Sequence, residues 1–60
     1  MKIIRKVNSY SLVENKTNSK TLKYYVDNGE DVSGYMDEFE IQHLRHVKKD
    51  EFIKECDKMF

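Results

Sequence analysis

A chain of sixty residues with a single cysteine has no covalent means of holding its fold together. Cys56 cannot form an internal disulfide, and a zinc site would have to add carboxylates to the two histidines. A chain of this length buries only about 60% of the surface that its unfolded form exposes. We therefore expect one small domain, residues 1–60, stabilised by packing alone, by forming a homodimer, or by a partner.

The same cysteine usage is typical of a reducing compartment, because disulfide-dependent small domains belong to oxidising ones. The basic start, Met1 to Lys6, is not followed by the apolar run of a signal peptide. No stretch approaches the roughly 18 apolar residues of a membrane span. We expect a cytoplasmic protein that makes no contact with membranes.

Charge is strongly segregated along the chain although the formal net charge is zero. Residues 1–26 contain six lysines and arginines against one acid, Glu14. Residues 27–42 contain six acids and no base, and residues 43–60 are nearly balanced. Opposite charges in separate segments favour two different contact surfaces, one basic and one acidic.

The first half of the chain has the composition of β-strands. Residues 2–14 are rich in β-branched and aromatic side chains, but their alternation slips near Asn8-Ser9, which predicts a bulge or kink there. Residues 15–20 are all turn formers or solvated residues and predict a hairpin tip. Residues 21–26 alternate cleanly, and Asp27-Asn28-Gly29 predicts a tight turn after them.

The middle of the chain fits two structures. A helix over 32–47 would place Glu40 inside its apolar stripe, whereas a strand over 39–47 places Phe39, Ile41 and Val47 on one face. We favour the strand and keep the helix as the alternative. Residues 50–59 predict a helix that begins at a capping Asp50.

These elements predict an α+β fold, a small three-stranded antiparallel sheet with one C-terminal helix packed on it. The sheet would consist of the N-terminal hairpin and the third strand. The expected core contains nine residues: Leu22, Tyr24, Val26, Phe39, Ile41, Phe52, Ile53, Cys56 and Met59.

Catalytic chemistry has little support in this sequence. His43 and His46 could share a zinc ion only on a helix, and two histidines at this spacing occur commonly by chance. Cys56 belongs to an apolar stripe, where a thiol packs as a small hydrophobe and ionises with difficulty. No nucleophile–base pair or phosphate loop is present. We expect no enzyme activity, no cofactor and no metal.

The acidic segment, residues 27–40, is the preferred binding surface. It interleaves carboxylates with apolar and aromatic side chains, and such a surface suits a basic site on a partner protein. We expect the chain to be a non-catalytic regulator or inhibitor that contacts its partner through six residues: Tyr35, Met36, Asp37, Glu38, Phe39 and Glu40.

A nucleic-acid-binding module is the alternative function. Lys23, Tyr24 and Tyr25 interleave a base with aromatic rings in the basic hairpin, as single-strand binders do. The sequence pI of about 6.7 argues against it, since non-specific affinity for nucleic acid depends on an overall positive field.

The pair Tyr24-Tyr25 before a glycine turn, the run Asp37-Glu38-Phe39-Glu40 and the charged C-terminal helix together resemble a known class. The chain is similar to small phage-encoded inhibitors, nearest in character to those that block the host uracil-DNA glycosylase by imitating DNA. This resemblance implies a small phage or mobile-element protein that binds and titrates a host or accessory protein.

Overall fold

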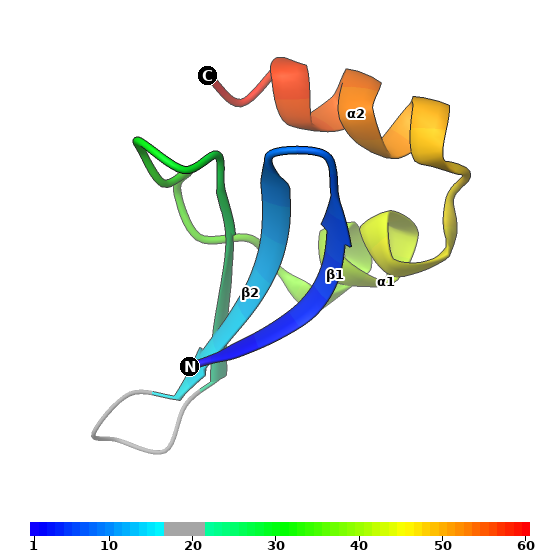
Figure 1. Ribbon diagram of the computed structural model, residues 1–60. Helices are drawn as coiled ribbons and strands as arrows, with labels where there is room; N and C mark the ends of the chain where they lie inside the picture. Colours follow the sequence, from blue (N-terminus) through cyan, green and yellow to red (C-terminus); the bar gives the residue numbers. More distant parts are fainter. Residues whose placement is uncertain (17–21) are drawn as a thin grey trace.

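The computed structural model of the chain describes residues 1–16 and 22–60 (Figure 1). Three antiparallel strands form a sheet in the order β1-β2-β3, with β1 at Lys2–Val7, β2 at Tyr10–Lys16 and β3 at Leu22–Asp27. Two helices follow, α1 at Glu38–His46 and α2 at Lys49–Asp57. The α+β class and the three-stranded antiparallel sheet are confirmed, but the described chain has two helices instead of one.

The N-terminal segment forms two strands rather than the single strand predicted for residues 2–14. Asn8 and Ser9 are a tight turn, so that Val7 pairs directly with Tyr10. Asn8 adopts a φ of 55°, a left-handed conformation that asparagine tolerates better than most residues. The break in the alternation therefore marks a hairpin turn, and the predicted bulge at this point is wrong. An irregularity in register lies instead between residues 3 and 5 of β1.

The tip of the second hairpin, between β2 and β3, is described only in part. Residues 15 and 16 of the predicted tip belong to β2, and the remainder of the tip lies outside the described residues. The turn after β3 is confirmed: Gly29 has a φ of 96°, and its N–H donates to Asp27 Oδ1 at 2.7 Å. Glycine suits this position because a φ of this sign is unfavourable for a side chain.

Residues 32–36 run back along the edge of β3. The N–H of Ser33 donates to the carbonyl of Val26 at 2.8 Å, and the N–H of Met36 donates to that of Tyr24 at 2.9 Å. Residues 32 and 36 each form an isolated antiparallel bridge with β3. These bonds satisfy part of the sheet edge and hold the acidic segment in a defined position.

The strand predicted for residues 39–47 is wrong: the segment is helical, as in the alternative, but the helix spans Glu38–His46 and not residues 32–47. The Asp37 side chain accepts a hydrogen bond from the Glu40 N–H at 2.9 Å, which caps α1. Acids in the first turn and bases in the last turn match the dipole of the helix. Ile41 and Leu44, three residues apart, are its buried side chains. The cap and the charge distribution were the signals for a helix.

Removing this cap should weaken the fold by a measurable amount. Asp37→Ala is expected to lower the free energy of unfolding by about 1 kcal/mol, since the Glu40 N–H would lose its partner. Urea denaturation followed by circular dichroism measures the change. Glu38→Ala is the control, because this neighbouring acid makes no capping bond, and an equal loss in both variants would contradict a specific role for the Asp37 cap.

The C-terminal helix is present as predicted, but it begins differently. Its N-cap residue is Lys48, which makes no side-chain capping bond, and Asp50 lies inside the first turn. Asp50 therefore stabilises the helix through its dipole and not as a cap. In the part of the chain that the structure describes, no helix is long and apolar enough to cross a membrane.

The core lies between the sheet and the two helices. A continuous cluster of eight buried residues is contributed by all five elements: Val7, Leu12, Tyr24, Val26, Ile41, Leu44, Phe52 and Cys56. Ile53 and Met59 pack against it as partly buried residues. Two members of the predicted core are wrong, because Leu22 is 46% exposed and Phe39 is 89% exposed.

The C-terminal end of the chain is held against the sheet. Figure 1 shows α2 passing across the end of the sheet at the turn between β1 and β2. The Tyr10 hydroxyl donates a hydrogen bond to Asp57, and the Tyr10 ring stacks on Phe60 with 6.0 Å between ring centroids. These contacts join the start of β2 to the end of α2.

Candidate functional site

The six predicted partner-binding residues do not form one continuous surface. Tyr35 is 64% exposed, whereas its neighbour Met36 is half-buried and packs against the core. Successive residues of an extended segment point to opposite sides, so these two side chains diverge. Met36 is therefore a packing residue. Its burial does not support the prediction that it belongs to the binding surface.

Tyr35 belongs to a small cluster with residues of β3. Its ring meets that of Tyr25 edge to face at a centroid distance of 6.3 Å. The Lys23 ammonium lies 4.7 Å from the centroid of the same ring, a cation–π arrangement. Lys23 and Tyr25 of β3 thus combine with Tyr35 of the following segment into a base with two tyrosines, while Tyr24 is buried in the core and cannot stack on a ligand.

The start of α1 presents the most exposed aromatic side chain among the described residues. Phe39 lies in the first turn and is 89% exposed. A hollow of about 190 Å³ lies beside it, lined by Glu38, Phe39 and Gln42. We call these three residues the α1 N-terminal surface. Asp37 lies next to this surface but is used by the cap, and Glu40 is only partly exposed.

The acidic segment keeps its charge unpaired within the described part of the chain. The ion pair found there joins Lys58 to Glu55, at 3.4 Å and outside the segment. Asp27 accepts a hydrogen bond from the Gly29 N–H, and Asp37 accepts the capping bond, so two of the carboxylates have local backbone partners. Glu30, Asp31 and Glu38 are exposed. The segment therefore carries a net negative field toward solvent.

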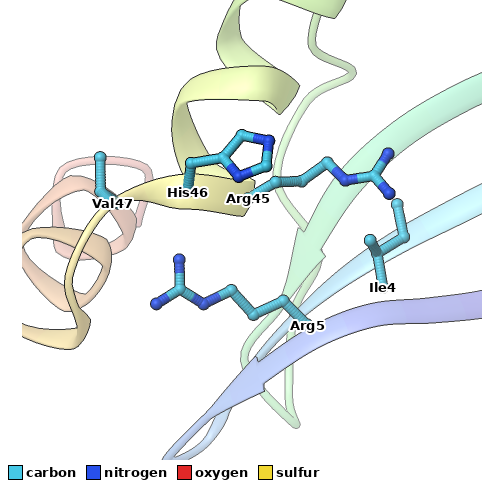
Figure 2. A pocket seen from close by; sticks show the side chains of 5 residues that line it. All are labelled: Ile4, Arg5, Arg45, His46 and Val47. Atoms are coloured by element: carbon cyan, nitrogen blue, oxygen red, sulfur yellow. The ribbon is translucent and has the colours of Figure 1, made fainter.

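A basic hollow of about 540 Å³ lies between β1 and the end of α1 (Figure 2). It is lined by five residues: Ile4, Arg5, Arg45, His46 and Val47. Arg5 Nη1 donates to the carbonyl of Leu44 at 2.7 Å, and its guanidinium carbon lies 4.8 Å from the centroid of the Phe52 ring. The sequence gives no signal for this site, because its two arginines are forty residues apart and meet only through the fold.

The two histidines lie in different surroundings although both belong to α1. Possible ligand atoms of His43, Glu51 and Glu55 all lie within 4.8 Å of one another, between α1 and α2. One imidazole and two carboxylates are donors that divalent transition metals accept. His46 instead lines the basic hollow, so the two histidines do not belong to one group of possible ligands.

Cys56 is fully buried, as its place in the apolar stripe of α2 predicts. Burial raises the pKa of its thiol from 9.0 to about 11, and the neighbouring carboxylates of Asp57 and Glu55 add to the effect. The unfolded chain ionises its thiol near pH 9, whereas the folded chain keeps it protonated to about pH 11. This thiol therefore lowers the free energy of unfolding as the pH rises from about 9 to about 11.

The thiol should react slowly in the folded chain. At pH 8, iodoacetamide is expected to label native Cys56 at least about 100-fold more slowly than the urea-unfolded chain. The pKa of the thiol is about 11 in the folded chain and 9.0 in the unfolded chain, so the reactive thiolate fractions differ by about 100-fold. Mass spectrometry measures the rates. A Ser9→Cys, Cys56→Ala variant, with its thiol in the exposed β1–β2 turn, serves as the reactive control. Equal rates in folded and unfolded wild type would contradict the burial of Cys56.

Comparisons with known proteins give no relative for this chain. No family model matches it, and neither a curated protein nor a solved structure is similar to it at a significant level.

Proposed function

We propose that this chain is a non-catalytic protein-binding regulator or inhibitor, of phage or mobile-element type, that docks a basic site on a host or accessory protein. The contact is made by the acidic segment, with the α1 N-terminal surface at its centre. The observation that carries the proposal is the position of Phe39, which is 89% exposed in the first turn of a capped helix.

An exposed phenylalanine on a rigid element is well suited to anchor a protein contact. Burying such a ring in a partner's pocket contributes roughly 1.5–3 kcal/mol. Because Asp37 caps the helix and Ile41 fixes it to the core, the backbone at Phe39 loses little freedom on binding. Aromatic anchors surrounded by polar residues are the usual centre of protein interfaces.

The carboxylates around Phe39 favour a basic partner. Glu38 is exposed beside the anchor, whereas Glu30 and Asp31 are exposed in the turn after β3, at the other end of the extended residues 32–36. Like charges gathered without paired bases contribute little to stability, whereas on a surface they steer a partner of opposite charge and raise the association rate. The phage-inhibitor character rests on the sequence resemblance, in which such acids stand in for the phosphates of DNA.

Capture from a nuclease-treated lysate of the native host, followed by mass spectrometry, tests the proposal. Wild type is expected to retain a protein with a basic surface, and Glu38→Lys is expected to lose most of it, because the reversed charge repels the partner. Lys54→Glu is the control, because it also reverses one charge, in the opposite direction, at an exposed position on α2. This variant should retain the protein.

The alternative is a nucleic-acid-binding module on the outer side of β3, favoured by the contact of Lys23 with the Tyr35 ring. It predicts the opposite result: nuclease treatment would empty the captured fraction, and Lys23→Glu would abolish retention while Glu38→Lys would not.

A further inference from the structure

The basic hollow is lined by arginine and histidine side chains from two elements that are distant in sequence. Figure 2 shows Arg5 reaching in from β1, while Arg45 and His46 come from the last turn of α1. Ile4 and Val47 supply the apolar part of the wall, and among the described residues no carboxylate lines the hollow. Its volume of about 540 Å³ lies within the ~300–1,000 Å³ range of small-molecule sites.

Arg5 is held in place before any ligand arrives. One of its N–H groups donates to the Leu44 carbonyl at 2.7 Å, and its guanidinium lies against the Phe52 ring in the core. The side chain is half-buried, so its long stem loses little further freedom on binding. A guanidinium has five N–H donors in a rigid fork, and those that Leu44 does not use can serve an oxyanion.

The positive charge at the hollow exceeds what the end of the helix requires. Basic residues near a helix C-terminus offset a partial charge of roughly −0.5. Two guanidinium groups and an imidazole line the hollow, and no acid occurs in the sequence from residue 41 to residue 49. Helix stabilisation therefore accounts for only part of this charge, and the remainder creates a local field that attracts anions.

We propose that this hollow binds the phosphoryl groups of a small phosphorylated molecule. Arginine matches phosphate oxygens with two parallel N–H donors, which makes it the preferred residue for such groups. In Figure 2 the Arg5 side chain extends toward the side of Val47 and the Arg45 side chain toward Ile4. We therefore expect a ligand with two linked phosphoryl groups, one for each guanidinium.

The test is a titration of the ¹⁵N-labelled chain, at constant ionic strength, with orthophosphate, inorganic diphosphate and a nucleoside diphosphate. Amide shifts are expected at residues 4–5 and 45–47, with diphosphate binding at least about tenfold more tightly than orthophosphate. Tighter binding of the nucleoside diphosphate than of diphosphate would identify an organic ligand, and equal binding would identify an inorganic one. Either result supports a phosphoryl site.

Variants separate this site from general attraction by positive charge. Arg45→Gln, at an exposed position, should weaken diphosphate binding about tenfold or more, the range of one lost hydrogen bond to a charged group. Lys48→Gln is the control for Arg45→Gln, because it removes the same charge at a nearby residue that does not line the hollow. His46→Gln tests the imidazole in the lining, and His43→Gln is its matched control. Both controls should bind like wild type.

Three results would overturn the proposal. The first is the absence of shifts at residues 4–5 and 45–47 with all three probes at millimolar concentration. The second is an equal loss of binding in Arg45→Gln and Lys48→Gln, which would show only a diffuse field. The third is binding of a single-stranded oligonucleotide at this face while the small phosphates do not bind, which would assign the hollow to nucleic acid.

Discussion

The Phe52→Ala variant is expected to be largely unfolded at room temperature. Phe52 is fully buried in the central cluster, and its ring supports the guanidinium of Arg5, which in turn bonds the end of α1. Truncating a buried phenylalanine lowers the free energy of unfolding by about 3–5 kcal/mol. A domain of this size rarely has more than about 3–5 kcal/mol of net stability. The expected loss is therefore as large as the net stability of the folded domain.

Circular dichroism during thermal and urea denaturation measures this effect. Phe60→Ala is the matched control, because the Phe60 ring is 47% exposed and stacks only at the end of the chain on Tyr10. We expect that variant to lose no more than about 1.5 kcal/mol. A cooperative melt of Phe52→Ala within a few degrees of wild type would show that α2 does not pack on the sheet.

The second large effect concerns binding. Phe39→Ala is expected to weaken the complex with the captured partner by about 30-fold or more, the range of an interface hot spot of about 2 kcal/mol, mainly through faster dissociation. The fold should be unchanged, since the ring is 89% exposed. Surface plasmon resonance gives both rates, and the melting temperature controls for folding.

Tyr35→Ala is the informative comparison for this prediction. Both rings are exposed and lie four residues apart, but Tyr35 packs on Tyr25 and Lys23 beside β3. A smaller loss than that of Phe39→Ala is expected. If Tyr35→Ala dissociates quickly and Phe39→Ala binds like wild type, the anchor lies on β3 and the assignment to the α1 N-terminal surface is wrong.

The sequence predicts the elements whose local signals agree with one another. β3 has clean alternation followed by a glycine turn, and α2 has an apolar stripe with Phe52 and Cys56, both of which are buried. The hairpin at Asn8-Ser9 is missed, and helix α1 is ranked below a strand, for a shared reason. Both are signalled by polar residues, Asn8 with its positive φ and Asp37 with its capping bond, which an apolar pattern does not weigh.

The candidate sites are less predictable than the fold. Phe39 is exposed because α1 turns Ile41 and Leu44 toward the core, whereas the favoured strand placed the Phe39 ring in the core. Tyr35 and Met36 separate because the segment before α1 is extended along β3. Arg5, Arg45 and His46 meet only after the sheet and α1 have packed, so no spacing in the sequence can reveal them.

A chemical-shift footprint of the captured partner on the ¹⁵N-labelled chain tests the central claim most directly. The acidic segment should carry the contact, so the largest amide changes are expected at residues 35–42, around Phe39 and Glu38. They should diminish as salt is added, because the attraction is partly electrostatic. Largest changes at residues 23–26 or at residues 4–5 and 45–47, with residues 35–42 unaffected, would contradict the account.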